Sequence, residues 1–246
     1  KRAELEKQKE KFIAGAIKNG IKKDVAGFVF TKIEPFADYG FNKSHAVAYA
    51  FIAFQTAYLK TYYKEEFIAA SMSTTLTNTS KLREYVEELK RLKVEVVRPS
   101  INNCFAEFKA ETNKIFYGLG AIKSVGFEAI SNIVNEREKN GKFKSFTDFI
   151  NRVNPKDVNK LQLEGLVKAG VFDEIDLNRK KLSESIPKII LTIKSKYEEK
   201  ISNQNNLFDV DSNRENEIFE FETSDKWTKK ELLSEEFSSL GFYISD

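Results

Sequence analysis

The sequence has very few of the residues that build metal sites and covalent cross-links. Cys104 is the only cysteine and His45 the only histidine among 246 residues. A structural zinc site takes four ligands of the Cys or His type, and a disulfide takes two cysteines, so the chain can build neither within itself. A single cysteine agrees with a reducing compartment, and we expect a cytoplasmic location.

Long apolar runs are also lacking. The most apolar stretch, Ala46–Leu59, is interrupted by Gln55 and Thr56, and it is shorter than the roughly 20 residues that a bilayer-spanning helix requires. We therefore predict that it forms a buried helix and that the protein has no membrane partner. The chain begins with Lys1 and has no charged-then-apolar leader, so we expect it to be a piece of a longer protein.

Positive and negative charges nearly balance over the whole chain, but each sign is concentrated locally. A formal net charge of +3 is too small to indicate nucleic-acid binding by itself. Residues 1–23 are rich in Lys and Arg, however, whereas residues 198–225 are mostly acidic. The first stretch can meet a polyanion, and the second would be repelled by one.

The hydrophobic pattern predicts a mainly α fold with a few short strands (α+β). Pro35 is expected to stop the second helix, and short strands are expected between Val94 and Tyr117 around a turn at Thr112-Asn113. Residues 203–225 have no periodicity and predict a linker. Helices are expected over Lys1–Asn19, Asp24–Ile33, His45–Lys60, Glu65–Leu76, Lys81–Leu92, Phe127–Arg137, Ser145–Arg152, Asn159–Ala169 and Asn178–Glu199.

The first motif with chemical potential is the stretch Tyr39–His45, directly before the apolar helix. A phosphate site needs cations and hydrogen-bond donors at the start of a helix, where the helix dipole also favours anions. Lys43 supplies the charge, and Asn42 and Ser44 supply donors, while Tyr39 and His45 offer rings that can pack on a sugar. The alternative is a structural loop in which Ser44 is the N-cap and His45 bonds to the backbone.

The second motif is the glycine-rich stretch Tyr117–Gly126, which is followed by a helix. A helix-hairpin-helix unit uses such a hairpin so that backbone N–H groups at the start of the next helix can approach a DNA phosphate. Ser124 stands where the hairpin usually has glycine, and Leu166–Gly170 is a weaker echo of Ile122–Gly126. An αα corner without a ligand is the alternative.

A third motif, Gln204–Phe208, lies in the acidic linker. A Leu-Phe pair in polar, unstructured sequence has no core to enter, so it can anchor in a pocket of a partner protein. Chance occurrence is the alternative for so short a string. The carboxylates at Glu87-Glu88 and at Asp173, Glu174 and Asp176 are expected to be solvated rather than to hold a metal.

In this order, the motifs resemble the alpha subunits of bacterial DNA polymerase III, the family C replicative polymerases. The resemblance covers most of the chain. It rests on YGFNKSHAVAYAFIAFQTAYLK (39–60), EEFIAASM (65–72), FYGLGAIKSVG (116–126), FKSFTDF (143–149), LVKAGVFD (166–173), QNNLF (204–208) and LGFYIS (240–245).

The resemblance implies an order of modules. Residues 1–98 would be a helical fingers portion, and residues 99–195 a tandem helix-hairpin-helix region that binds duplex DNA. Residues 196–226 would be an acidic linker with a clamp-binding peptide, and residues 227–246 the start of a truncated following segment. The family's palm, which holds two Mg²⁺ ions, has no counterpart in the sequence, so the chain alone is expected to be inactive and to contain no catalytic or metal-binding residue.

The resemblance also implies site residues and partners. The whole protein would be a DNA-directed DNA polymerase, a nucleotidyltransferase, which binds primer-template duplex, a deoxynucleoside triphosphate, the sliding clamp (beta subunit) and other replicase subunits. The triphosphate would meet Tyr39, Asn42, Lys43, Ser44 and His45. The duplex backbone would meet Gly118, Gly120, Lys123, Ser124 and Gly126, and the clamp would bind Gln204, Leu207 and Phe208. Two rival hypotheses are a free-standing helix-hairpin-helix DNA-binding protein and a clamp-interaction scaffold.

Overall fold

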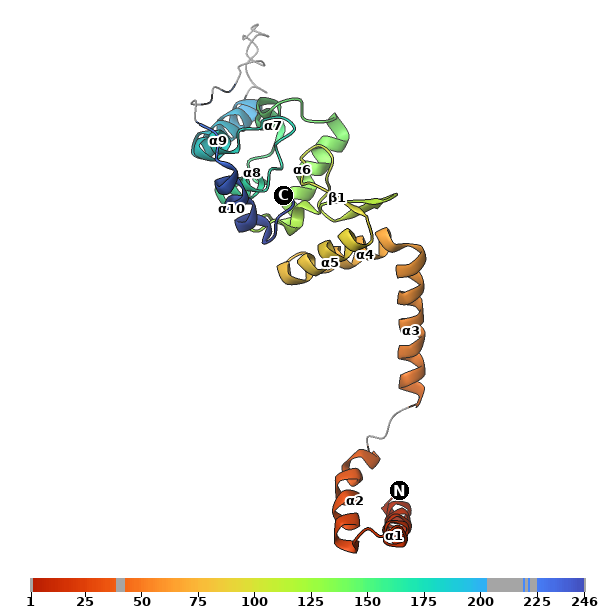
Figure 1. Ribbon diagram of the computed structural model, residues 1–246. Coiled ribbons are helices and arrows are strands. Elements are labelled where there is room, and N and C mark those ends of the chain that lie inside the picture. The colour runs from red at the N-terminus through yellow and green to blue at the C-terminus, as the bar shows by residue number, and fades with distance from the viewer. Residues whose placement is uncertain (1, 39–42, 203–218, 220, 222–224, 246) are drawn as a thin grey trace. The chain divides into compact units, whose positions relative to one another are not determined.

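A computed structural model describes residues 2–38, 43–202, 219, 221 and 225–245. The chain divides into two compact units, Lys1–Leu59 and Lys60–Asp246, and each is considered by itself. The described residues are mainly helical with one small sheet (Figure 1), which confirms the predicted fold class. The module boundaries predicted at residues 98, 195 and 226 come from the family resemblance. They need not coincide with the division into compact units, and they stay predictions.

In the first unit, two helices pack against each other and are joined by a short turn at Gly20. Helix α1 spans Arg2–Lys18 and helix α2 spans Lys23–Asp38. Gly20 has a φ of 79°, a left-handed conformation that glycine adopts without strain and that ends α1 as predicted. The rings of Phe12 and Phe30 lie 5.5 Å apart between the two helices, where Phe30 is buried.

The predicted end of the second helix before Pro35 is wrong, because α2 continues through Pro35 to Asp38. A proline inside a helix removes one backbone hydrogen bond, the one to the carbonyl four residues earlier. Pro35 and Thr31 are both exposed. Water can therefore solvate the carbonyl that loses its partner, and the last turn remains helical.

Helix α3 spans Lys43–Tyr62 and includes the stretch Ala46–Leu59, which was predicted to be buried. That prediction is wrong, since none of the residues of α3 is buried by the described part of the chain. The side chains of Val47, Phe51 and Phe54 are all more than half exposed. Apolar composition shows that a helix favours burial, but it does not supply the surface that would cover it.

No helix in the described part of the chain combines the length and the apolarity that a bilayer crossing requires.

The second unit begins with two helices that support a three-stranded sheet. Helix α4 spans Lys64–Ser73 and α5 spans Thr79–Arg91, and α4 packs against the strands β2 and β3. The side chain of Asn78 accepts a hydrogen bond from the Lys81 N–H, which caps α5 as predicted. Leu82, Val86 and Leu89 are buried at helical spacing, as their pattern predicts.

The sheet confirms the short strands predicted between Val94 and Tyr117. Its strands are β1 (Glu95–Val97), β2 (Lys109–Glu111) and β3 (Lys114–Phe116), in the order β1-β3-β2. β2 and β3 are antiparallel and joined at the predicted turn, where Asn113 has a φ of 60°. β1 runs parallel to β3.

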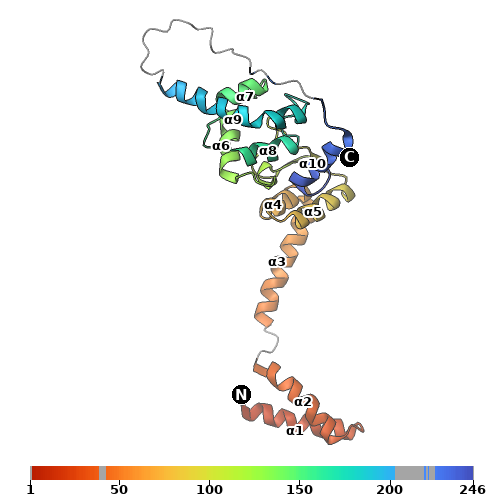
Figure 2. The same cartoon turned by 90° about the vertical axis from the view of Figure 1, so that its left-hand side faces the viewer.

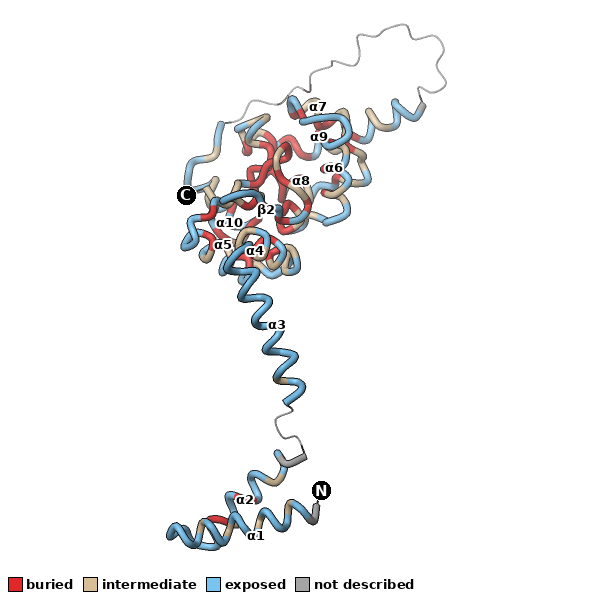
Figure 3. Tube along the Cα trace, turned by 90° about the vertical axis from the view of Figure 1, so that its right-hand side faces the viewer, coloured by how far each residue is buried: buried red, intermediate tan, exposed pale blue. Residues whose placement is uncertain are grey.

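The rest of the second unit is helical. It comprises a 3₁₀ turn, η1 (Leu119–Ala121), and the helices α6 (Phe127–Asn140), α7 (Phe146–Arg152), α8 (Lys160–Lys168), α9 (Arg179–Ser202) and α10 (Lys229–Leu240). Figure 2 shows α10 beside α8, and the two are in contact. Figure 3 shows the buried residues concentrated around α8.

Aromatic side chains fill the core between α7, α8 and α9. The ring of Phe172 lies 4.9 Å from the rings of both Phe146 and Phe149. Phe143 packs edge-on against Phe149. Each of these rings is buried, so the contacts fix the position of α7 and of the turn after α8.

Two buried polar groups hold the loops of this unit to its helices. Arg137 of α6 is 4% exposed and donates to the backbone carbonyls of Ile101 and Cys104. Asn102 and Phe143 exchange two hydrogen bonds of 2.8 and 2.9 Å through the Asn102 amide and the Phe143 backbone. These bonds satisfy groups that would otherwise be buried without partners.

The acidic group after α8 was expected to be solvated, and this prediction is wrong for two of its members. Asp173 accepts two hydrogen bonds, of 2.8 and 2.6 Å, from the guanidinium of Arg179. Asp176 forms an ion pair with Lys181. The helix that follows brings these cations back onto the acidic turn, a contact that spacing alone did not reveal.

Candidate nucleic-acid interface

The residues 122–126 form a tight hairpin between η1 and α6. The Val125 N–H donates to the Ile122 carbonyl at 3.1 Å, which closes the turn. Ser124 has a φ of 64°. The sequence led us to expect glycine at this position, and the left-handed backbone gives the physical reason, because a Cβ atom costs about 1–2 kcal/mol there.

The hairpin leads directly into the N-terminus of α6, with Gly126 as the N-cap residue. As a glycine it has no side chain that could accept from the first-turn N–H groups. The first intrahelical bond runs from the Ile130 N–H to the Gly126 carbonyl, so the N–H groups before Ile130 point out of the helix end. Gly126 and Phe127 are exposed. The arrangement suits an anion approaching the helix axis.

Two of the glycines predicted to lie along DNA instead pack against the rest of the unit. A Cβ at Gly118 would lie 2.8 Å from the Phe108 backbone nitrogen, and one at Gly120 would lie 2.9 Å from the Ala106 carbonyl oxygen. Gly118 is buried. Both glycines therefore permit close approach of η1 to the segment before β2. A DNA contact for them stays a prediction.

Two residues of α8, Gly165 and Gln162, pack against the hairpin. A Cβ at Gly165 would lie 2.6 Å from the Lys123 carbonyl oxygen, and a Cβ at Gly126 would lie 3.1 Å from the side-chain nitrogen of Gln162. Gly165 was not among the predicted site residues. Its signal was a glycine inside an otherwise regular helical pattern, which indicates close packing of another backbone.

The weaker echo ends at Gly170, which has a φ of 77° and terminates α8 as predicted. The guanidinium of Arg179 lies so close to Gly170 that a Cβ there would be 2.1 Å from its nitrogen. The following helix α9 is capped by Asn178, whose side chain accepts from the Lys181 N–H at 3.1 Å. This second turn is thus filled by its own side chains, unlike the open N-terminus of α6.

The residues predicted to bind a nucleotide are only partly described. Lys43, Ser44 and His45 form the exposed first turn of α3. Because the helix begins at Lys43, Ser44 lies inside it and is not the N-cap that the structural alternative required. The His45 ring lies 4.3 Å from the ring of Tyr49 one turn later. Tyr39 and Asn42 lie outside the described residues, and the nucleotide site stays a prediction.

The three residues predicted to bind a clamp, Gln204, Leu207 and Phe208, also lie outside the described residues. The chain is described again at Phe219 and Phe221, whose rings are 4.7 Å apart. Phe221 packs on Phe146 at 5.7 Å, and Lys181 lies over its ring. These contacts attach the end of the acidic stretch to α7 and α9.

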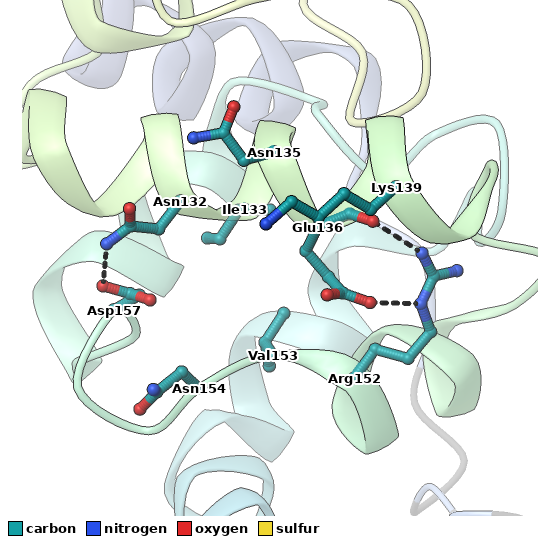
Figure 4. A pocket seen from close by; sticks show the side chains of 9 residues that line it. All are labelled: Asn132, Ile133, Asn135, Glu136, Lys139, Arg152, Val153, Asn154 and Asp157. Atoms are coloured by element: carbon teal, nitrogen blue, oxygen red, sulfur yellow. Dashed lines mark hydrogen bonds and ion pairs between the residues drawn. The ribbon is translucent and has the colours of Figure 1, made fainter.

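A polar recess of about 250 Å³ lies between α6 and the loop after α7 (Figure 4). Two acidic and two basic side chains line it, and Arg152 donates to Glu136 at 3.1 Å. Asn132 donates to Asp157 at 2.9 Å across the recess. Because its acidic and basic side chains are equal in number, the recess has less net attraction for an anion than the open end of α6.

The single cysteine is unsuited to nucleophilic chemistry. Burial raises the pKa of the Cys104 thiol to about 11, so the thiolate is scarce at neutral pH. Burial also raises the pKa of Tyr117. Within the part of the chain that the structure describes, no three His, Cys, Asp or Glu side chains gather in a way that could hold a metal ion.

Comparison with known proteins agrees with this geometry. Residues 93–182 match the family described as the helix-hairpin-helix motif, a range that contains the hairpin at 122–126, α6 and the turn at Gly170. The match covers both the open hairpin and its filled echo.

Curated relatives named DNA polymerase III subunit alpha match the chain over 98–100% of its length. The relative from Borreliella burgdorferi is 42% identical over 100% of this chain and 22% of its own length. Those from Caulobacter vibrioides and Campylobacter jejuni are each 38% identical over 100% and 98% of this chain, and over 21% and 20% of their own lengths. The chain therefore spans about one fifth of the length of these relatives, and the predicted resemblance to the alpha subunits of bacterial DNA polymerase III is confirmed.

Proposed function

We propose that this chain is the part of a DNA-directed DNA polymerase that grips duplex DNA, and that the hairpin 122–126 with the N-terminus of α6 holds one phosphate. The observation that carries the proposal is the open, glycine-capped helix end at Gly126. The helix-hairpin-helix match over residues 93–182 and the name of the relatives support it.

The expected contact follows from the chemistry of the helix end. Backbone N–H groups and the helix dipole favour a phosphate oxygen but carry no information about base sequence. Lys and Arg that neutralise phosphates release counterions, so affinity falls as salt rises. We therefore expect duplex binding that is insensitive to sequence and weakened by salt.

Gly126→Ala tests this contact. The backbone at Gly126 has a φ of −75° and a ψ of 131°, which alanine adopts without strain, and the nearest atom belongs to the end of the flexible Gln162 side chain. The added methyl group would keep a phosphate from the N–H groups, and we expect duplex affinity to fall about tenfold, the equivalent of one charge-assisted hydrogen bond.

The matched control is Gly15→Ala in α1, where an added Cβ meets nothing within 4 Å. It should leave duplex affinity unchanged, as measured by fluorescence anisotropy with a labelled duplex over a series of salt concentrations. If Gly126→Ala binds duplex as tightly as the unchanged chain while Gly15→Ala does the same, the end of α6 does not hold a phosphate.

A second part of the proposal concerns the incoming deoxynucleoside triphosphate. Lys43, Ser44 and His45 lie on the exposed first turn of α3, where a cation and a helix dipole act together on an anion. In the whole polymerase, Lys43→Ala should raise the KM for nucleotide strongly, and Lys43→Arg should restore much of it. A Lys43→Ala enzyme with unchanged KM would exclude this role.

The third part assigns Gln204, Leu207 and Phe208 to a sliding clamp. An apolar pair beside a polar linker provides the anchors that short peptides use in partner pockets. The double variant Leu207→Ala with Phe208→Ala should lose capture by immobilised clamp and keep duplex affinity. Retained clamp capture would refute the assignment.

The bond-forming step is assigned to another part of the whole polymerase, where Mg²⁺ would be held by a palm. We accordingly expect no primer extension by this chain alone, and a cytoplasmic location with the other replicase subunits. A free-standing helix-hairpin-helix protein is a weaker hypothesis, because similarity to the polymerase subunits extends over the whole chain rather than over residues 93–182 alone.

A further inference from the structure

The C-terminal end of α10 contacts the hairpin through two hydrogen bonds from one residue. The Lys123 backbone N–H donates to the Ser239 carbonyl at 3.0 Å. The Lys123 ammonium donates to the Ser238 carbonyl, also at 3.0 Å. Both carbonyls belong to the last turn of α10, whose carbonyl groups have no partner inside the helix. A cation at this end also meets the negative pole of the helix dipole. Lys123 therefore caps α10.

The same contact restrains the hairpin. Ser124, the next residue, is held in the left-handed conformation that costs a residue with a Cβ free energy. The Lys123 carbonyl on the other side rests on Gly165 of α8, where no side chain could fit. The strained turn is thus held between α8 and α10, and surrounding contacts of this kind are what allow such a conformation to persist.

Buried contacts fix α10 in this place, more than a hundred residues away in the sequence. Glu236 is 1% exposed and accepts hydrogen bonds from the backbone N–H groups of Ile244 and Ser245, at 2.8 and 2.9 Å. It also lies 3.5 Å from the guanidinium of Arg179. Leu240 and Phe242 are buried, and Gly241 packs closely against Thr79 at the start of α5. The end of α10 is therefore a rigid support.

We infer that α10 is part of the DNA-gripping site and that Lys123 is a positioning residue, whose ammonium binds the end of α10 rather than a phosphate. The DNA consequence rests on the proposed function. The family resemblance placed Lys123 along the duplex backbone, whereas its hydrogen bonds give it a partner within the chain. The α10 contact would set the direction of the N–H groups that follow Ser124.

Amide hydrogen exchange on the free chain tests the mutual support without DNA. Lys123→Met removes the ammonium and keeps the length of the side chain. We expect exchange to become several times faster both at the end of α10 (237–242) and in the first hydrogen-bonded turn of α6 (130–133), whose first bond runs from the Ile130 N–H to the Gly126 carbonyl. Lys123→Arg, which can still donate, should restore protection. Lys230→Met is the control, because it removes one exposed positive charge from the start of α10. Unchanged exchange at either segment in Lys123→Met overturns the inference.

Duplex binding over a series of salt concentrations distinguishes positioning from direct contact. A lysine that neutralises a phosphate contributes about 0.9 to the slope of log affinity against log salt. We expect Lys123→Met to weaken binding about three- to tenfold, the effect of one lost hydrogen bond, with the slope unchanged. A slope smaller by about 0.9 would identify Lys123 as a phosphate ligand and overturn the inference.

Phe242→Ala provides a second route, since it loosens α10 without altering the hairpin. It should weaken duplex binding in the same way, again with an unchanged slope. The control Tyr243→Phe, which keeps the ring that lies 5.2 Å from the Phe237 ring of α10, should have no effect. If the unchanged chain binds no duplex, the proposed function fails, and hydrogen exchange alone decides whether α10 and the hairpin support each other. Unaltered duplex affinity in a loosened Phe242→Ala chain would contradict the role of α10.

Discussion

At the scale of single residues, the hairpin combines an unfavourable side chain with a demanding backbone. Ser124 has the positive φ for which glycine is suited. Serine pays about 1–2 kcal/mol for its Cβ there, partly offset because glycine loses more backbone entropy on folding. The left-handed backbone at position 124, rather than the serine side chain, therefore defines the turn.

Ser124→Gly should stabilise the chain for this reason. We expect the free energy of unfolding to rise by about 0.5–1 kcal/mol, the difference between the two opposing effects. Denaturant unfolding monitored by circular dichroism measures it. Ser124→Ala keeps the Cβ and should give no gain. A Ser124→Gly chain that is no more stable than Ser124→Ala would show that the turn is not strained.

Glu128 lies in the first turn of α6, close to the proposed phosphate. A carboxylate there interacts favourably with the helix dipole and stabilises the helix, but it repels a second anion. Glu128→Gln should therefore strengthen duplex binding about two- to fivefold at low salt, as expected for one repulsion between partly exposed charges. The gain should shrink as salt rises. Glu138→Gln, at the other end of the same helix, is the control, and an equal gain there would remove the argument.

At the scale of elements, the hairpin depends on how closely it approaches α8. A Cβ at Gly165 would lie 2.6 Å from the Lys123 carbonyl, which is a backbone atom and cannot move independently of the turn. Gly165→Ala should lower the free energy of unfolding by about 1–3 kcal/mol through overpacking, although alanine favours the helix itself. Gly27→Ala in α2 has open space and should not destabilise. Equal stabilities for the two variants would refute this packing.

The start of α10 carries a pH-sensitive cap. Thr228 accepts from the Glu231 N–H, and the Glu231 carboxylate accepts from the Thr228 N–H at 2.8 Å. The Thr228 hydroxyl also donates to this carboxylate, and the bonds from the Thr228 N–H and hydroxyl lower the pKa of Glu231 below its ordinary value of 4.5. A carboxyl with a lowered pKa in the folded state stabilises it above the ordinary pKa, and the effect is lost as pH falls through the lowered value.

We therefore expect amide protection at the start of α10 to decrease as pH falls below about 4.5, the ordinary pKa of this carboxyl. Glu231→Gln should abolish the pH dependence of this segment, after correction for intrinsic exchange rates. Glu235→Gln, further along α10, is the comparison. A pH dependence that survives in Glu231→Gln would assign it to another group.

Most elements of this fold could be predicted from local patterns, and the failures have a common cause. The cap at Asn78, the turn at Asn113 and the helix ends at Gly20 and Gly170 depend on the chemistry of neighbouring residues. Whether α3 is buried and whether Asp173 pairs with Arg179 depend on which segments the fold brings together. Hydrophobic periodicity contains information about neighbouring residues and not about contacts between segments that are distant in the sequence.

The same division applies to the candidate site. The hairpin at 122–126 and the unusual Ser124 could be found from glycine spacing, since the turn type is a local property. Gly165 and the end of α10 could not, because they reach the hairpin through tertiary contacts. Lys123 illustrates the limit most clearly. The family resemblance implied that it contacts DNA, and only the fold revealed its partner in α10.

At the scale of the whole molecule, the chain is two compact units with separate candidate roles. The first contains the exposed turn at Lys43, and the second contains the hairpin and its supports. The relatives match both units in one continuous alignment, yet the chain spans only about one fifth of their length. Under the proposed function, this chain would position substrates, and the chemistry would belong to other parts of the polymerase.

The most direct test of duplex gripping is a titration of the isotope-labelled chain with a short duplex, followed by amide chemical shifts. The account predicts that the largest shifts fall on the N–H groups from Ser124 to Ala129, independently of duplex sequence and reduced by added salt. Shifts that avoid this segment and gather elsewhere on the second unit would contradict the assignment of the hairpin as the phosphate-binding element.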